Sequence, residues 1–341
     1  MKRVVTFGEI MLRMAPSGYL KFIQADHFDI NYTGAEANVC VSLRNFGMEA
    51  DFVTKLPDND ITGCVMATMR KFDVGVSKIV IGGERLGTYY LERGASQRPS
   101  KVIYDRKYSS VSMSSRCDYD WDAIFSDAGW FHFTGITAAL SDNMPEICED
   151  ACKAAKARGL TISCDLNYRK NLWSSEKAAS VMRSLAKYID VVIGNEEDAE
   201  KCLGIKPSGS DVVGGKLDYS GYSEAARQIS EQFGVKKVAF TLRTSKSASD
   251  NSWAAMLYTD GQAYFSKTYD IHMVDRVGGG DSFSAALIYA LYSENYEPQS
   301  AIEFAVAASC LKQTMEFDFN LATVSDVELL MGGDGSGRVQ R

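Results

Sequence analysis

The middle of the chain alternates between short apolar segments and amphipathic helical segments, and this alternation restricts the fold more than any other feature of the sequence. The apolar segments are 129–135, 160–167, 190–198 and 236–242, and the helical segments are 144–159, 175–188 and 223–234. Such alternation produces βαβ units, in which the strands run parallel and the helices cover the sheet. We therefore predict an α/β fold with a central, mostly parallel sheet flanked by helices, and ligands at the carboxyl ends of its strands.

Two segments do not fit this alternation, because residues of about 10–33 and 84–110 are strand-like and rich in aromatic side chains. We interpret them as the strands of a small β lid that leaves the main domain. Residues 208–221 are rich in glycine, serine and aspartate, which is typical of a flexible surface loop. The prediction is one domain over 1–331, followed by a disordered tail at 332–341.

The composition argues against several classes of protein. A net charge of −7 argues against nucleic-acid binding, because a phosphate backbone requires a basic protein face. The 8 cysteines form no C-x-x-C pair, so we expect reduced core thiols in a cytosolic protein and no zinc site. No run of about 18 apolar residues occurs, which predicts that the chain does not span a membrane. The expected localisation is the cytoplasm.

The sequence DRVGGGDSF, residues 275–283, places a run of glycines and an aspartate directly before a segment with helical spacing. The first N–H groups of a helix have no partner within it, and the helix dipole adds positive charge there. Because glycine has no Cβ atom, Gly278, Gly279 and Gly280 predict a cradle in which an anion approaches these donors. Asp281 would repel a permanently bound phosphate, but it suits a phosphoryl group in transfer, since it accepts the proton of the attacking hydroxyl. The alternative is a glycine-rich helix cap with Asp281 as a first-turn acid.

These residues resemble the C-terminal signature of the ribokinase-like (PfkB) carbohydrate kinases, D-[TR]-x-G-A-G-D-x-F, with glycine in place of alanine. An N-terminal signature is similar as well: YTGAEANVCVSLRNFG and then KLPDNDITG resemble the family's G-G-x-x-x-N-x-A-x-x-L-x-x-L-G and G-x-D-x-x-G. The resemblance covers about residues 3–331, with the motifs in the family's order. Within the family, the segments GEIMLRMAP, VIYDRKYSS, DLNYRKNLW and DFNLATVSDVE are most similar to the 2-keto-3-deoxygluconate kinases.

The resemblance implies a ribokinase-like fold with a β-clasp lid, the use of ATP and Mg²⁺, and transfer of the γ-phosphoryl group to a hydroxyl of a sugar acid. It implies that Asp281 is the general base and that the three glycines form the anion hole. A keto-deoxy acid carries a carboxylate, which the planar fork of an arginine binds well. On the family's pattern, the substrate-binding residues are Gly34, Asn38, Tyr90, Tyr104, Arg106, Ile136 and Arg169.

The nucleotide-binding residues that the resemblance implies are Asn195, Thr241, Arg243, Gly278 and Gly280. GNEEDAEKC resembles the family's N-x-x-E motif, which organises Mg²⁺ and the phosphates, but aspartate stands in its fourth position. Since aspartate is one methylene shorter than glutamate, the water-mediated contact with Mg²⁺ is assigned to Glu197 or Asp198. The loop TLRTSKSASDNSW lacks the glycines of the family's T-x-G-x-x-G, which leaves the preferred phosphate donor open. Asp275 matches a position that helps to hold a monovalent cation in several relatives.

The leading interpretation is a kinase that converts 2-dehydro-3-deoxy-D-gluconate to its 6-phosphate, with fructose, ribose and the galactonate epimer as alternative acceptors. Arg106 and Arg169 favour an acidic acceptor, because an unpaired arginine in a closed pocket is unfavourable. Their alternative role is in surface salt bridges. A non-catalytic sugar or nucleotide sensor on the same fold is a further alternative, and the intact GGGD sequence argues against it. The open edges of the lid strands predict that two lids pair in a homodimer or a higher homo-oligomer.

Overall fold

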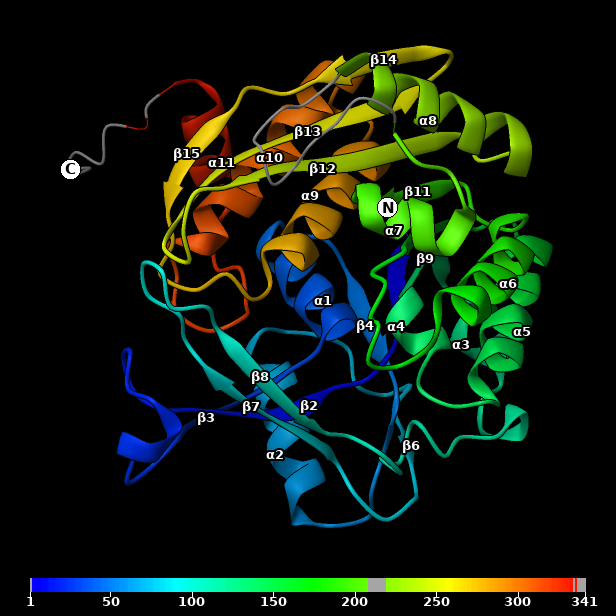
Figure 1. Cartoon of the computed structure of the whole chain (residues 1–341). Helices are drawn as coiled ribbons and strands as arrows, with labels where there is room; N and C mark the ends of the chain where they lie inside the picture. The colour runs from blue at the N-terminus through cyan, green and yellow to red at the C-terminus, as the bar shows by residue number, and fades with distance from the viewer. Residues whose placement is uncertain (1, 208–218, 334, 336–341) are drawn as a thin grey trace.

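The structure is a computed structural model that describes residues 2–207, 219–333 and 335 (Figure 1). Its large sheet contains, in spatial order, β14 (Gln262–Phe265), β13 (Asp250–Thr259), β12 (Lys237–Ser245), β11 (Val191–Gly194), β10 (Thr161–Asp165), β9 (Ala128–Thr134), β1 (Arg3–Phe7) and β4 (Ala50–Val53), and β15 (Tyr269–His272) pairs with β13. The six strands β12, β11, β10, β9, β1 and β4 pair with one another in parallel. Strand β13 pairs antiparallel with β12, and β14 and β15 pair antiparallel with β13. The predicted mostly parallel sheet is confirmed.

Helices cover both faces of this sheet, as Figure 1 shows. One face packs against α1 (Ala35–Asn45), α2 (Asp60–Lys71), α9 (Gly279–Ser293), α10 (Pro298–Gln313) and α11 (Val324–Met331), and the other against α3 (Trp121–Ile124), α5 (Met144–Ala157), α6 (Ser175–Ala186) and α8 (Tyr219–Phe233). Consecutive residues of a strand point to opposite faces, so Val4 and Val5 of β1 belong to different hydrophobic clusters. Burial on both faces explains why the strands read as continuous apolar segments.

The predicted lid is present as a separate sheet with the order β3 (Asp29–Thr33), β2 (Met11–Ala15), β7 (Gly87–Glu92) and β8 (Lys101–Asp105). These strands lie below the large sheet in the view of Figure 1. Strand β2 alternates between buried and half-buried residues, and its inner side chains pack with those of β7 around Tyr89 and Leu91. All five residues of β8 are exposed, and β8 and β3 form the two edges of the lid sheet.

The remaining elements are short. They are β5 (Lys55–Leu56) and β6 (Val80–Ile81), the helical turns α4 (Gly135–Ala138) and α7 (Glu196–Asp198), the 3-10 turns η1 (Phe22–Gln24) and η2 (Arg116–Asp118), and the π turn η3 (Ala199–Leu203). A surface loop was predicted over 208–221, of which 208–218 lie outside the described residues. The prediction is wrong for 219–221, because these residues form the start of α8. Most of the predicted tail, 334 and 336–341, also lies outside them.

The cysteines agree with the prediction of free thiols. None of them is in a disulfide, and all but Cys64 and Cys117, which are exposed, are buried. The expectation of core thiols is therefore wrong for these two. Within the described ranges, no group of three or more histidine, cysteine or acidic residues is arranged to hold a metal ion. No helix in this part of the chain has the length and apolar character needed to cross a membrane.

Candidate active site

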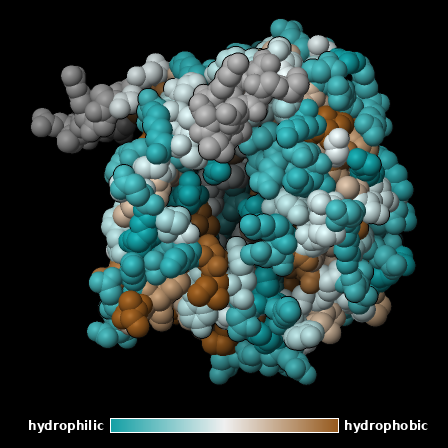
Figure 2. Space-filling view, in the orientation of Figure 1, coloured by the Kyte–Doolittle hydropathy of each residue, from teal (hydrophilic) through white to brown (hydrophobic). Residues whose placement is uncertain are grey.

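A cleft of about 460 Å³ opens between the carboxyl ends of the parallel strands and the lid. The hollow is visible near the middle of the face in Figure 2. The size suits a small-molecule site. The cleft brings together most of the residues predicted from the sequence: Gly34, Asn38, Tyr104, Arg106, Ile136, Arg169, Asn195, Glu197, Asp198, Thr241, Arg243, Gly278, Gly279, Gly280 and Asp281. Tyr90 and Asp275 are not among the residues that line it.

The glycine run forms the floor of the cleft, where α9 begins. Gly278 precedes the helix with a φ of +85°, and a Cβ atom on it would lie 2.0 Å from the carbonyl oxygen of Asp318. Gly280 is exposed, and a Cβ atom on it would meet no atom within 4 Å. Gly278 is thus needed for the backbone turn, whereas Gly280 leaves space on the cleft side. Gly278, Gly279 and Gly280 all line the cleft, so the backbone at the start of α9 forms a cradle suited to an anion.

Asp281 lies in the first turn of α9, beside this cradle. Its Oδ2 accepts a hydrogen bond of 2.6 Å from Nδ2 of Asn38. Asn38 is itself oriented, because its Oδ1 accepts a hydrogen bond of 2.8 Å from the Thr33 hydroxyl. Burial, with smaller contributions from the carboxylates of Asp318 and Glu36, raises the pKa of Asp281 to about 7, although the hydrogen bond from Asn38 opposes this rise. A carboxyl group with this pKa accepts a proton near neutral pH.

Arg106 is in the cleft, but it is paired. Its Nε donates a hydrogen bond of 2.7 Å to Oε2 of Glu9, and its guanidinium lies over the Tyr104 ring at 5.3 Å. The argument that an unpaired arginine disfavours a neutral acceptor is therefore wrong for Arg106, because Glu9 compensates its charge. Arg169 differs, because its side chain is exposed and donates a hydrogen bond of 3.0 Å to the backbone oxygen of Tyr168. Within the described residues it makes no ion pair, although its charge lowers the pKa values of Asp165 and Asp281.

Gly34 and Ile136 come from different elements of the fold. A Cβ atom on Gly34 would lie 1.9 Å from the carbonyl oxygen of Glu9, so glycine allows α1 to start against the link between β1 and β2. Ile136 lies in the turn α4, directly after β9. Both residues line the cleft as predicted.

The prediction that Tyr90 contacts the substrate is wrong, because the neighbouring Tyr89 is the one that lines the cleft. Successive residues of a strand point to opposite faces, so a shift by one residue exchanges the two side chains. Tyr89 lines the cleft and donates a hydrogen bond of 2.8 Å to Asp318. Tyr90 packs on the other face of the lid, with its ring 5.9 Å from that of Phe28.

Several further acidic residues line the cleft. Both carboxylate oxygens of Asp198 accept backbone hydrogen bonds, from Tyr168 at 2.8 Å and Asn195 at 3.0 Å, so this side chain fixes the turn after β11. Glu197 is exposed and lines the cleft. Burial, and then Asp198 and Asp281, raise the pKa of Asp165 well above its ordinary value. The charge of Arg169 compensates these carboxylates only in part. Their clustering favours a divalent cation nearby, since Mg²⁺ typically binds through one or two carboxylates, water and phosphates.

A pair of arginines also lines the cleft. Arg243 comes from β12 and Arg276 from the connection before α9. Burial and the charge of Arg243 lower the pKa of Arg276, so the two cations lie close enough to repel each other. Such a pair favours a bound anion. Sequence reasoning missed Arg276, although it stands inside the DRVGGGDSF motif. Thr241 lies on the same strand as Arg243 and donates to the Gly194 carbonyl at 3.4 Å.

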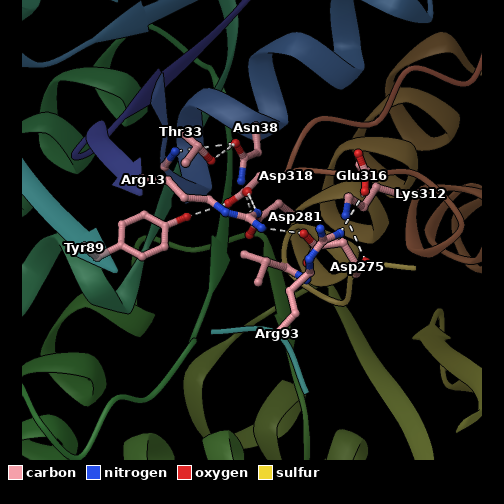
Figure 3. Close-up of polar contacts among 12 residues, drawn as sticks. Arg13, Thr33, Asn38, Tyr89, Arg93, Asp275, Asp281, Lys312, Glu316 and Asp318 are labelled. Atoms are coloured by element: carbon pink, nitrogen blue, oxygen red, sulfur yellow. Dashed lines mark hydrogen bonds and ion pairs between the residues drawn. The ribbon is translucent and has the colours of Figure 1, made fainter. Parts of the chain in front are cut away.

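Asp275 does not present a free carboxylate to a cation. Its Oδ2 is 2.5 Å from Nη2 of Arg13, and its Oδ1 accepts a hydrogen bond of 3.1 Å from the backbone N–H of Val277 (Figure 3). The expected monovalent cation therefore does not fit the residues present, because an arginine that the sequence reasoning missed occupies the partner position. No local pattern signals this pair, since Arg13 and Asp275 are 262 residues apart.

Known proteins share this architecture. Residues 1–315 match the pfkB family carbohydrate kinases. The crystal structure of a 2-dehydro-3-deoxygluconokinase from Thermotoga maritima is 48% identical and covers 97% of this chain and 98% of its own, with a TM-score of 0.94. A 2-dehydro-3-deoxygalactonokinase of Haloferax volcanii is 30% identical, with 97% of each chain covered. A 2-dehydro-3-deoxygluconokinase of Thermoproteus tenax is 27% identical over 90% of this chain and 87% of its own.

The family match spans nearly the whole chain, including both glycine-containing signatures and the lid. The large sheet, the flanking helices and the four-stranded lid form the ribokinase-like fold that the resemblance implied. The chain belongs to the pfkB family of carbohydrate kinases.

Proposed function

We propose that this protein transfers the γ-phosphoryl group of ATP to the 6-hydroxyl of 2-dehydro-3-deoxy-D-gluconate. The observation that carries the proposal is the position of Asp281 in the first turn of α9, beside the glycine cradle and oriented by Asn38 at 2.6 Å. A base next to an anion cradle is the arrangement that phosphoryl transfer to a hydroxyl requires. The names of the similar proteins from Thermotoga maritima and Thermoproteus tenax support the acceptor.

In the proposed reaction, Asp281 takes the proton of the acceptor hydroxyl. The hydroxyl oxygen forms a bond to the γ-phosphorus while the bond from that phosphorus to its bridging oxygen breaks, and ADP leaves with the electron pair. The backbone N–H groups around Gly278, Gly279 and Gly280 stabilise the negative charge on the moving group. Asn38 holds the carboxylate of Asp281 toward the acceptor, since its own amide is fixed by Thr33.

The nucleotide is assigned to the end of the cleft that contains Asn195, Thr241, Arg243 and Arg276. The two arginines are assigned to the phosphates, because a bound anion would relieve their mutual repulsion. Glu197 would hold Mg²⁺ through water, whereas Asp198 orients the turn with both of its oxygens. When bound, Mg²⁺ neutralises the charge of the phosphates.

The acceptor's carboxylate is assigned to Arg169, with Arg106 and Tyr104 beside it. Arg169 is exposed at the cleft and makes no side-chain ion pair among the described residues, whereas Arg106 is already bonded to Glu9. An acidic acceptor would give Arg169 a charged partner. The galactonate epimer remains a second acceptor, because the Haloferax volcanii relative has that activity in its name and the epimers differ only at one hydroxyl.

The test is coupled ADP release with Mg²⁺-ATP and 2-keto-3-deoxygluconate, its galactonate epimer, fructose or ribose. We expect kcat/KM to be at least about 10²-fold higher for the keto-deoxy acids than for the neutral sugars. Arg169→Met should raise KM for the acids, whereas Lys170→Met, which changes the exposed neighbour outside the cleft, should not. Preference for a neutral sugar would contradict the acceptor, and no ADP from any acceptor would favour a sensor.

The assembly and location complete the proposal. We expect a homodimer in which the lids pair, since β8 is an edge strand with exposed Val102 and Ile103. The absence of C-x-x-C pairs and the free thiols of the described cysteines favour a reducing compartment, and we propose the cytoplasm.

A further inference from the structure

A buried ionic cluster lies near Asp281, at the start of α9 (Figure 3). Arg13 is bonded to the carboxylates of Asp275 and Asp318, and the three side chains are 1%, 2% and 2% exposed. Tyr89 donates to the second oxygen of Asp318, at 2.8 Å. Lys312, fully buried, donates from Nζ to the carbonyl oxygen of Asp275 at 3.0 Å. The two cations and two carboxylates balance, which is what a buried cluster requires.

The members of the cluster come from three different parts of the fold. Arg13 lies on β2 and Tyr89 on β7, so both belong to the lid. Asp275 lies in the connection that leads into α9, and Lys312 lies in the last turn of α10. The cluster is therefore a joint between the lid and the main domain.

Both aspartates contact the backbone that forms the cradle. Asp275 accepts a hydrogen bond from the N–H of Val277, the residue before the glycine run, at 3.1 Å. The carbonyl oxygen of Asp318 lies so close to Gly278 that only a glycine fits there. A displacement of either aspartate would therefore move the backbone N–H groups that bind the phosphoryl group.

We propose that Arg13 is a positioning residue that supplies, from the lid, the fixed cation between Asp275 and Asp318 in place of a monovalent metal ion. This inference rests on the proposed phosphoryl transfer at the cradle. The planar guanidinium bonds both carboxylates at once, which a single ammonium group does less well. Its charge is always present, so the cradle keeps its shape without potassium or sodium. The lid thereby holds the cradle in place when it lies over the cleft.

The first experiment compares kinase rates of the wild-type enzyme with potassium, sodium or tetramethylammonium as the monovalent cation, at constant ionic strength. The rates should agree within about twofold, because Arg13 already fills the position. A rate at least about tenfold higher in potassium would overturn the proposal.

The second experiment removes the guanidinium. Arg13→Ala should lower kcat by about 10²-fold, with the KM values for ATP and acceptor little changed, because a small displacement of reacting groups has this effect. Arg93→Gln is the matched control: it breaks another contact between lid and domain, the 3.0 Å bond from Arg93 to Glu316, but leaves the buried cluster intact. This control should keep the wild-type kcat, and an equal loss in both variants would overturn the specific role of Arg13.

Two further variants separate positioning from folding, since loss of one partner of a buried ion pair is strongly destabilising. Arg13→Ala/Asp318→Asn restores the charge balance and should recover most of the lost Tm without recovering kcat. Arg13→Lys should recover part of kcat, as it returns the charge without the fork. Wild-type kcat in the double variant would overturn the positioning role.

Measurements of Tm test the cation position without any acceptor. Their result therefore applies even if the proposed kinase function is wrong. Potassium should raise the Tm of Arg13→Ala relative to tetramethylammonium, because the vacated space lies between two carboxylates, and should leave the wild-type Tm unchanged. An equal effect of potassium on both proteins, or none on either, would contradict the assignment of Arg13 to a cation position.

Discussion

At the scale of single residues, Asp281 is subject to opposing influences. Burial and the neighbouring carboxylates of Asp318 and Glu36 disfavour its charge, while the hydrogen bond from Asn38 favours it. The result is a pKa of about 7 instead of the ordinary 3.8. A base with this pKa is ionised for a large part of the time at neutral pH and still binds a proton readily, which suits proton transfer.

The first prediction concerns stability. Because the folded protein resists ionisation of Asp281, the folded state binds more protons than the unfolded chain between pH 3.8 and about 7, and stability falls as pH rises through this window. Asp281→Asn removes this loss, so its Tm should exceed that of the wild type at pH 8, and the difference should shrink at pH 5. Thermal unfolding at both pH values measures it. A lower Tm for the variant at pH 8 would contradict the pKa argument.

The second prediction separates the roles of two glycines. Gly278→Ala places a Cβ atom at a φ of +85° and against the Asp318 carbonyl, so it should lower the free energy of unfolding by about 1–3 kcal/mol and abolish activity. Gly280→Ala meets no protein atom, so it should keep the wild-type Tm but lower kcat by obstructing the cradle. Urea unfolding and ADP release measure the two effects. Equal destabilisation by both substitutions would contradict this distinction.

A site residue could be predicted from the sequence when its partners are close to it along the chain. The glycines and Asp281 were predicted because they are contiguous and each has a separate chemical reason to be there. Tyr90 was predicted in place of Tyr89 because two consecutive tyrosines on a strand leave the facing residue undetermined. Arg13 and Asp318 were missed because they are 305 residues apart, and only tertiary packing brings them together.

At the scale of elements, the strand–helix alternation was sufficient to predict the parallel sheet, since each strand has its own apolar run and its own terminating polar residues. The antiparallel strands β12 and β13 are joined by the loop that we propose faces the nucleotide. Both strands are long, with nine and ten residues, and together they present Arg243 and Trp253 to the cleft. Side chains from this pair of strands thus contribute to the lining of the cleft.

The third prediction belongs to this pair of strands. Arg243→Ala should raise KM for ATP by about tenfold or more and change kcat less, because it removes a charged hydrogen-bond donor from the phosphates. Lys246→Ala is the control, since Lys246 lies on the same hairpin but is bonded to Asp270 at 2.5 Å and does not line the cleft. Initial rates over a range of ATP concentrations measure both. An unchanged KM in Arg243→Ala would remove this residue from the nucleotide site.

At the scale of the whole molecule, we expect the exposed edge of the lid sheet to be where copies of the chain associate. The fourth prediction is a dimer of twice the 37.5 kDa chain mass in light scattering. Ile103→Lys, which places a charge on the 55% exposed residue of β8, should shift the mass to that of one chain. Ile81→Lys should leave the dimer intact, because Ile81 is 46% exposed but lies in β6, outside the lid sheet. A dimer that persists in Ile103→Lys would place the interface elsewhere.

The measurement that tests the central claim most directly is turnover by the wild type and Asp281→Asn with Mg²⁺-ATP and 2-keto-3-deoxygluconate from pH 5.5 to 9. The wild-type kcat/KM should rise with pH and reach half its maximum near pH 7, as Asp281 loses its proton. The variant should turn over about 10²–10⁴-fold more slowly and lack this rise, because it has no base to ionise. Wild-type turnover in Asp281→Asn, with the same pH profile, would contradict the assignment of Asp281 as the base.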